Sequence, residues 1–159
     1  MKITYEPIGI VHSPFTDVSS MPIQPTSEAS REGMVEIYPA YVEGLQDVDG
    51  FSHLILLYHM HAVRTVKLSV IPFLDTVARG VFATRAPTRP NPIGLSIVRL
   101  VEIEGGNLKV DHLDVLDGTP LLDIKPYVPE FDARTDVREG WLAAARDRVK
   151  NTSSDDRFT

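Results

Sequence analysis

Short runs of alternating or β-branched apolar residues recur along most of this chain, whereas a helical period occurs in only one segment. Alternation with a period of two indicates β-strands, because successive side chains of a strand point to opposite faces of a sheet. The predicted strands lie at residues 3–11, 33–38, 51–61, 65–71, 80–84, 95–104, 108–116 and 120–124. Residues 137–149 place Ala and Arg at helical spacing and predict a C-terminal helix. The pattern therefore predicts a mainly β fold, a mostly antiparallel sheet or barrel with one short C-terminal helix.

Composition restricts the class of protein. The 159 residues suit a single domain with a sizeable core, and the absence of cysteine excludes disulfides, thiol nucleophiles and cysteine metal sites. The longest apolar stretch, residues 54–58, is far short of the ~18 residues of a membrane span, and the start lacks the pattern of a signal peptide. We expect a cytoplasmic protein without membrane contact. Residues 1–136 are expected to form the barrel, 137–150 a helix of the same domain and 151–159 a flexible tail.

Charge is segregated along the sequence. The formal net charge is −6, which argues against indiscriminate binding to nucleic acid. Residues 76–101 nevertheless carry four arginines and no acid, while residues 1–75 and residues 110–132 each have an excess of about five acids. Chance and solvated loops are one explanation of such small counts. The other is an anion-binding segment beside an acidic one, as a charged cofactor and a phosphate-bearing substrate would need.

The most unusual segment is the loop at residues 85–94, RAPTRPNPIG, whose three prolines exclude a regular helix or an inner strand. Proline restricts both itself and the residue before it, so this loop loses little entropy when it holds a ligand. Arg85 and Arg89 each offer a planar fork to a carboxylate or phosphate, and Asn91 offers both a donor and an acceptor. A rigid connector with surface arginines is the alternative, but stiffness, charge and hydrogen-bonding capacity together favour a binding loop.

An acidic segment follows at residues 111–120, DHLDVLDGTP. In regular strand geometry Asp111 and His112 face opposite sides of the sheet, and so do Leu113 and Asp114. Asp114 lies within an apolar alternation, where a carboxylate is either a paired structural residue or a functional one.

The histidines raise the alternative of a metal site. His59 and His61 would point to the same face of one strand, with Asp114 as a third ligand, and zinc accepts such donors. The simpler interpretation is that these histidines border a binding cleft, and we predict no metal site. The sequence also lacks a glycine-rich dinucleotide loop, a G-x-x-x-x-G-K-[ST] loop and a G-x-S-x-G turn, which disfavours P-loop nucleotide hydrolysis and serine hydrolysis.

Four segments together resemble the TrmO family of S-adenosylmethionine-dependent tRNA methyltransferases. They are residues 7–15 (PIGIVHSPF), 51–54 (FSHL), 80–94 (GVFATRAPTRPNPIG) and 113–127 (LDVLDGTPLLDIKPY). The resemblance implies a single-sheeted β-barrel that forms a homodimer. It also implies methyl transfer to N6 of N6-threonylcarbamoyladenosine, next to the anticodon of threonine tRNA.

The resemblance further implies a set of residues that contact S-adenosylmethionine. They are Ile23, Gln24, Pro25, His59, Met60, Arg85, Leu95, Asp111, His112, Leu113 and Asp114. Members of the family usually have Arg or Lys where this chain has Ile23, so a basic contact is missing at that position.

Methyl transfer from a sulfonium depends on alignment, and the N6 nitrogen of such a base is a poor nucleophile. We therefore predict that Asp114 accepts the N6 proton or binds the cofactor ribose. Arg85 is expected to bind the cofactor carboxylate, Arg89 a tRNA phosphate or the threonyl carboxylate, and Asn91 the amino group. Asp114, Asn91 and Arg89 are thus the predicted catalytic residues. Two alternatives are a module that binds S-adenosylmethionine or another nucleoside without catalysis, and a metal hydrolase built on the two histidines.

Overall fold

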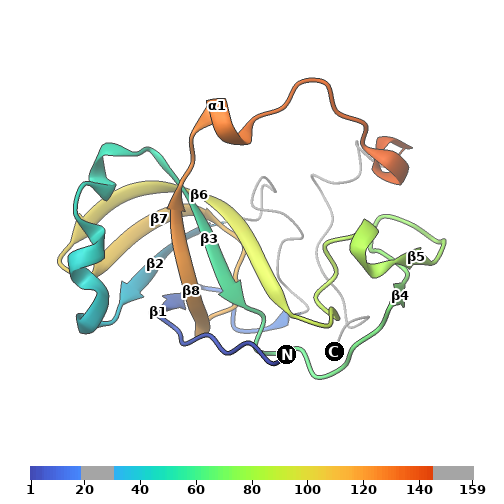
Figure 1. Cartoon of the computed structure of the whole chain (residues 1–159), viewed down its shortest axis with the longest axis horizontal. Coiled ribbons are helices and arrows are strands. Elements are labelled where there is room, and N and C mark those ends of the chain that lie inside the picture. The colour runs from blue at the N-terminus through green and yellow to red at the C-terminus, as the bar shows by residue number, and fades with distance from the viewer. Residues whose placement is uncertain (19–30, 145–159) are drawn as a thin grey trace.

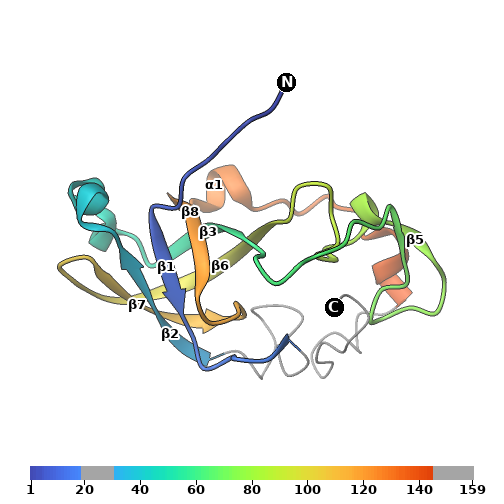
Figure 2. The same ribbon diagram turned by 90° about the horizontal axis from the view of Figure 1, so that it is seen from below.

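Six strands form a closed antiparallel barrel in a computed structural model that describes residues 1–18 and 31–144. The barrel strands follow one another in the order β1-β2-β7-β6-β3-β8 (Figures 1 and 2). They are β1 (Gly9–His12), β2 (Arg31–Ile37), β3 (His53–His59), β6 (Ile93–Glu104), β7 (Asn107–Leu113) and β8 (Thr119–Pro126). The mainly β, barrel-like fold predicted from the alternation is confirmed.

The barrel interior is filled by aliphatic side chains from all six strands. Every second residue points inward, so on β6 Ser96 and Val98 are buried while Leu95 and Ile97 are exposed. Fully buried members of this core are Val11, Val35, Leu56, Val98, Leu108 and Leu121. Burial of one such side chain contributes about 1.5–3 kcal/mol, which makes this core the main source of stability.

Short helices flank the strands. The 3-10 helices η2 (Pro39–Leu45) and η3 (Val48–Gly50) connect β2 to β3, and α1 (Pro129–Asp132) follows β8. Pro129 opens α1, where a missing backbone N–H costs no hydrogen bond. Among the described residues, no helix is long and apolar enough to cross a membrane.

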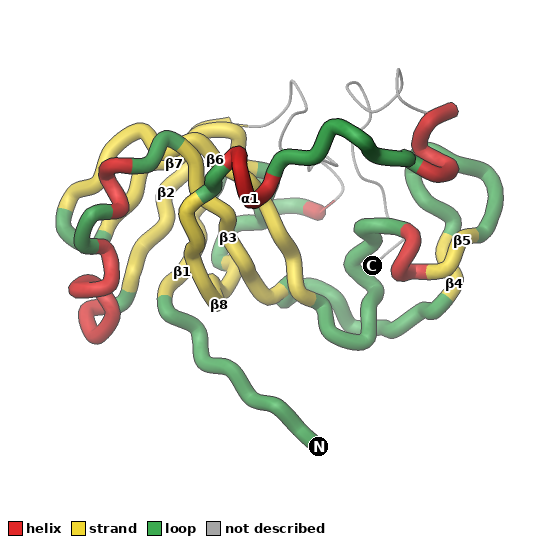
Figure 3. Tube along the Cα trace, turned by 45° about the horizontal axis from the view of Figure 1, so that its top comes forward, coloured by secondary structure: helices red, strands yellow, loops and turns green. Residues whose placement is uncertain are grey.

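Residues 60–92, between β3 and β6, leave the barrel and form a lobe beside it (Figure 3). The lobe contains the paired strands β4 (Ser69–Val70) and β5 (Arg79–Gly80), followed by the 3-10 helix η4 (Val81–Ala83). It has an apolar cluster of its own, formed by Val70, Val81 and Ala86 with Phe73 packed against them. The strand predicted at residues 80–84 is therefore mostly a helical turn, which places Val81 in this cluster.

A C-terminal helix is predicted at residues 137–149, but the part of this segment that the structure describes, residues 137–144, contains only a short 3-10 helix. Residues 137–139 are not helical, and η5 (Gly140–Ala144) is a 3-10 helix without a buried residue. Gly140 has a φ of 57°, a left-handed conformation that interrupts a right-handed helix. The segment instead contacts the lobe, because Trp141 Nε1 donates a hydrogen bond to the Ala83 carbonyl at 2.8 Å. Residues 145–159 lie outside the described residues, and the predicted domain division stays a prediction.

The antiparallel topology brings three connections to one end of the barrel. At this end β1, β3 and β7 finish, while β2, β6 and β8 begin. The chain leaves the barrel at this end after β1, again after β3 to form the lobe, and after β7 through residues 114–118. We call it the lobe end of the barrel. Segments far apart in the sequence, including most of the predicted site residues, meet there.

Candidate functional site

Three polar side chains form a hydrogen-bonded chain at the lobe end of the barrel. The Ser96 hydroxyl donates to Asp114 Oδ1 at 2.5 Å, and the Tyr58 hydroxyl lies 3.0 Å from Ser96 Oγ. An ionised carboxylate only accepts hydrogen bonds, so Ser96 gives its single proton to Asp114 and Tyr58 donates to Ser96. The hydrogen bonds from Tyr58 to Ser96 and from Ser96 to Asp114 hold one oxygen of the Asp114 carboxylate in place. The carboxylate keeps further lone pairs that can accept hydrogen bonds from a ligand.

Glycine at position 94 is required by the Tyr58 ring. Gly94 pairs with Tyr58 across β6 and β3, and a Cβ built on Gly94 would lie 2.1 Å from Tyr58 Cε2. Any side chain there would displace the ring whose hydroxyl begins the hydrogen-bonded chain. The last residue of the proline-rich motif therefore has a packing role.

A β-bulge in β7 positions Asp114 next to Ser96. Arg31 pairs with Leu113 but Gly33 pairs with Val110, so β7 contains one extra residue relative to β2. His112 takes up this residue with a φ of 63°, a left-handed conformation that is strained for a residue with a side chain. Regular alternation was the prediction for this segment, and the bulge alters it. Leu113 remains fully buried, and Asp114 reaches Ser96 beyond the last pairing of β7 with β6.

Burial controls the protonation of this cluster. Desolvation raises the pKa of Asp114 to about 6, although the Ser96 hydrogen bond and the positive charge of Arg85 act in the opposite direction. Desolvation, reinforced by the negative charge of Asp114, also raises the pKa of Tyr58 above its ordinary value. Tyr58 therefore stays protonated near neutral pH. Asp114 titrates close to neutrality, as a group that exchanges a proton with a ligand should.

Arg85 links the lobe to the cluster. It follows η4 on the proline-rich loop and is exposed, and its positive charge acts on both Asp114 and Tyr58. A lobe cation therefore acts on a carboxylate at the lobe end of the barrel, and the predicted contact of Arg85 with the cofactor carboxylate stays a prediction.

Arg89 has an internal role in the lobe. Its Nη1 donates to the carbonyls of Val81, Thr84 and Ala86 at 3.3, 2.8 and 3.2 Å. These bonds hold the turn that carries Arg85. The predicted contact of Arg89 with a phosphate or threonyl carboxylate stays a prediction, and this geometry favours a positioning role. Asn91 is exposed near the start of β6, and its predicted contact also stays a prediction.

The other predicted cofactor residues are distributed over two faces. His59 is exposed at the end of β3, and Met60 N donates to the Pro92 carbonyl at 2.8 Å, which joins the two ends of the lobe. Leu95 is 45% exposed on the outer face of β6, opposite to the inward Ser96. Asp111 and His112 lie at the bulge, with His112 exposed. Ile23, Gln24 and Pro25 lie outside the described residues.

Sequence reasoning missed Tyr58 and Ser96. A signal for both was present, because each occupies an inward position of an apolar alternation and carries a hydroxyl that needs a partner when buried. The alternative of a metal site is not supported, because within residues 1–18 and 31–144 no three His, Cys, Asp or Glu side chains lie close enough together to hold a metal ion. His61 Nδ1 instead lies 3.2 Å from Thr119 Oγ1.

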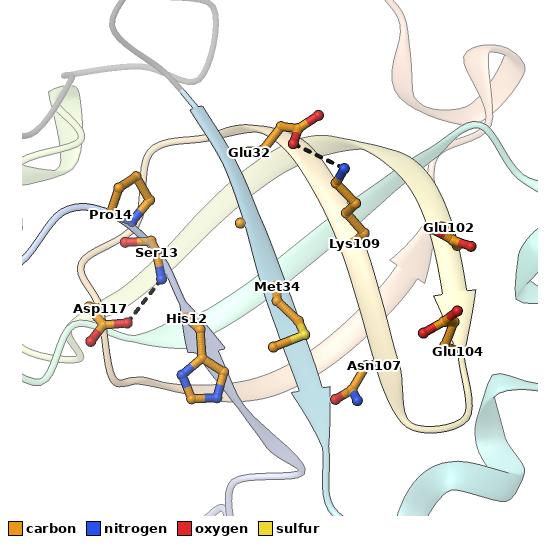
Figure 4. Close-up of a pocket in the computed structure, with 11 residues that line it drawn as sticks. His12, Ser13, Pro14, Glu32, Met34, Glu102, Glu104, Asn107, Lys109 and Asp117 are labelled. Carbon is orange, nitrogen blue, oxygen red and sulfur yellow. Dashed lines mark hydrogen bonds and ion pairs between the residues drawn. The ribbon is translucent and has the colours of Figure 1, made fainter.

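A groove on the outer face of β1, β2, β7 and β6 is separate from this site (Figure 4). It is lined by His12, Ser13, Pro14, Glu32, Gly33, Met34, Glu102, Glu104, Asn107, Lys109 and Asp117. Its lysine, Lys109, is paired with Glu32 at 3.1 Å, and Asp117 accepts from the Ser13 N–H at 2.9 Å. The groove is therefore acidic, does not suit a phosphate, and contains none of the predicted site residues.

The fold and site define a class: a closed β-barrel with a half-buried carboxylate at one end, on which a cation of the proline-rich loop acts. A sequence profile described as "tRNA-methyltransferase O N-terminal domain" matches residues 10–133. The chain therefore belongs to the tRNA-methyltransferase O, or TrmO, family, and the resemblance found in the sequence is confirmed.

Relatives and solved structures agree with this assignment. A probable S-adenosyl-L-methionine-binding protein of Pyrococcus abyssi is 52% identical over 158 residues, which cover 99% of this chain and 86% of that protein. The tRNA (adenine(37)-N6)-methyltransferase of Escherichia coli (strain K12) is 36% identical, over 89% of this chain and 64% of the enzyme. A crystal structure of TrmO from Pseudomonas aeruginosa superposes with a TM-score of 0.73 at 42% identity, over 88% of this chain but only 62% of that one.

Proposed function

We propose that this chain is an S-adenosylmethionine-dependent tRNA methyltransferase that acts on N6 of N6-threonylcarbamoyladenosine next to the anticodon. The observation that carries the proposal is the Asp114 carboxylate, which Ser96 and Tyr58 hold at the lobe end under the charge of Arg85. Membership of the family supports methyl transfer to tRNA. The names of the Escherichia coli and Pyrococcus abyssi relatives support an adenine target and S-adenosylmethionine.

The side chains at the lobe end suit the chemical groups of S-adenosylmethionine. A guanidinium such as that of Arg85 binds the cofactor's carboxylate as a charge-assisted fork. A carboxylate with unused lone pairs, such as Asp114, accepts either a ribose hydroxyl or the proton of the target nitrogen. When bound, the cofactor supplies an electrophilic methyl group.

The target nitrogen needs help from the protein. The lone pair of N6 is delocalised into the ring and the carbamoyl group, so N6 attacks effectively only as its proton is removed. Asp114 would accept the N6 proton while N6 attacks the methyl group that the sulfonium of the bound cofactor would supply, with the thioether as leaving group. The raised pKa of Asp114 suits this role, since a carboxylate of ordinary pKa is a much weaker base.

Access to N6 requires that the base leave the stack of the anticodon loop, as enzymes that modify a base generally demand. The cationic lobe would then contact neighbouring phosphates. Binding of tRNA should weaken as salt rises, because each phosphate contact releases counterions. A salt-independent affinity would contradict this part of the proposal.

A homodimer forms part of the proposal. The outer face of β6 exposes Ile93, Leu95, Ile97 and Val101, at 44, 45, 37 and 48% of their surfaces. A second copy of the chain would cover this apolar stripe. Light scattering should give twice the monomer mass, and Ile97→Lys should shift the protein toward monomer. A monomeric wild-type protein would refute this element.

A binding module without catalysis is the second candidate, favoured by the names of relatives such as the probable S-adenosyl-L-methionine-binding protein of Pyrococcus abyssi. Incubation with labelled S-adenosylmethionine and total tRNA separates the two, because only an enzyme transfers label to RNA. Nucleoside mass spectrometry of tRNA from a deletion strain then identifies the product. Loss of the methylated threonylcarbamoyl nucleoside supports the proposal, and its unchanged level would contradict it.

A further inference from the structure

The lobe is the basic part of an acidic protein. Residues 60–92 carry five basic side chains and one acid, so the formal charge of the lobe is +4 while that of the whole chain is −6. The acid, Asp75, is paired with Arg79 at 2.8 Å, and this arginine holds the pKa of Asp75 below its usual range. Arg64 and Lys67 are exposed on the same lobe. A polyanion approaching this protein is therefore attracted to the lobe.

Phe82 projects from the lobe into solvent. It lies in η4 and is 75% exposed, although Val81 beside it is only 1% exposed and belongs to the lobe's apolar cluster. The Arg89 guanidinium lies 5.8 Å from the centroid of the Phe82 ring. The ring is therefore supported by a cation while most of its surface remains available.

The turn that presents Phe82 is rigid. Val81 N donates to the Leu68 carbonyl at 2.9 Å, which ties η4 to the neighbouring strand segment. The Thr84 hydroxyl donates to the Val81 carbonyl at 2.9 Å, and Arg89 donates to the carbonyls on either side of Phe82. A ring held outward in this way loses little conformational entropy on binding a flat partner.

Phe82 also lies close to the candidate site along the chain. Only two residues separate it from Arg85, whose charge acts on Asp114, so the Cα atoms of Phe82 and Arg85 are at most about 11 Å apart. Phe82 and the candidate site could therefore contact neighbouring nucleotides of the same RNA loop.

We propose that Phe82 is a stacking platform for an unstacked nucleobase of the RNA substrate, adjacent to the target adenosine, with Arg64 and Lys67 on the flanking phosphates. The inference rests on the proposed function and adds the contact that holds the loop open. Aromatic rings bind unpaired bases through their faces without regard to sequence, and cations beside them follow the phosphate backbone.

The test measures binding of an anticodon stem-loop RNA by fluorescence polarisation. Phe82→Ala should weaken RNA binding by roughly 5- to 100-fold, as loss of a base-stacking aromatic does. Phe82→Trp should keep the affinity, and Phe82→Leu should be as weak as alanine because leucine has no π-face. The matched control is Phe131→Ala, since Phe131 is 70% exposed but lies on α1, away from the lobe (Figure 1).

Two further measurements separate a loss of base stacking from other effects of the substitution. Calorimetry should show unchanged affinity of Phe82→Ala for S-adenosylmethionine, and light scattering an unchanged mass. The stacking proposal would be overturned if Phe82→Ala bound RNA as tightly as the wild type, or if Phe82→Leu did so. It would also be overturned if Phe82→Ala changed the molecular mass of the protein in solution without changing its RNA affinity. If the wild-type protein bound the stem-loop through Phe82 but methylated no tRNA, the stacking role of Phe82 would be supported and the proposed function would be refuted.

Discussion

The barrel and the lobe are built by different means. The barrel buries aliphatic side chains from six strands in one closed core, and a polar chain runs from Tyr58 through Ser96 to Asp114 at its lobe end. The lobe has two short strands and a small apolar cluster of three buried residues, and its turn depends on Arg89 bonds to main-chain carbonyls. The barrel can therefore hold a carboxylate with a raised pKa, while the lobe presents charges and rings to solvent.

The two regions should thus respond differently to substitution. Changes at the lobe end of the barrel should affect chemistry or global stability, because that region is buried and closed. Changes in the lobe should affect local order and ligand contacts while the barrel stays folded, because the lobe and the barrel have separate apolar clusters.

The largest effect is expected from Asp114→Asn. It keeps the shape of the side chain but removes the proton acceptor, so turnover should fall by about 10²- to 10⁴-fold. Initial rates with tRNA and S-adenosylmethionine measure this, and thermal unfolding confirms that the barrel is intact. Wild-type turnover would show that Asp114 is not the base.

Gly94→Ala should be next, because its Cβ would lie 2.1 Å from the Tyr58 ring. The free energy of unfolding should fall by about 1–3 kcal/mol, the usual cost of overpacking. Urea denaturation measures it. Gly80→Ala is the control, since a Cβ at Gly80 meets nothing within 4 Å, and an equal loss in both variants would refute the packing role.

Arg89→Ala should loosen the lobe and spare the barrel. Loss of its carbonyl contacts should speed amide hydrogen exchange near η4 roughly tenfold, which corresponds to about 1.4 kcal/mol of local stability. Exchange in β3 and β6 should stay unchanged. If those strands also exchanged faster, the lobe and barrel would be one cooperative unit.

The smallest effect at neutral pH is expected from Ser96→Ala, and it sharpens the picture of the site. The wild-type pH profile of kcat/KM should rise through a pH of about 6 as Asp114 ionises. Without the Ser96 hydrogen bond, which lowers the pKa of Asp114, the inflection should move to higher pH. An unmoved inflection would assign the titration to another group.

The same pKa predicts a stability trend. Because the pKa of Asp114 is higher folded than its ordinary value of 3.8, the folded state holds the proton more tightly between pH 4 and 6. This carboxyl therefore favours folding at low pH and loses that contribution as pH rises through about 6. Asp114→Asn should remove this component from the pH dependence of urea denaturation.

Much of this molecule follows from the sequence alone. Periodicity predicts the barrel strands because each strand's inward residues must be apolar wherever it packs. The motifs identify the family, and Arg85 and Asp114 stand out as charged residues among prolines or apolar neighbours. Tyr58 and Ser96 were missed because strand alternation marks them only as inward residues, while their mutual contact depends on how β3 pairs with β6.

What only the tertiary structure decided are the relations between segments distant in sequence. The order of the strands, the bulge at His112 and the contact of Ser96 with Asp114 arise from contacts between distant segments, and no local pattern encodes them. Periodicity determines which face of a segment is buried, but closing the barrel determines which side chains from different segments meet.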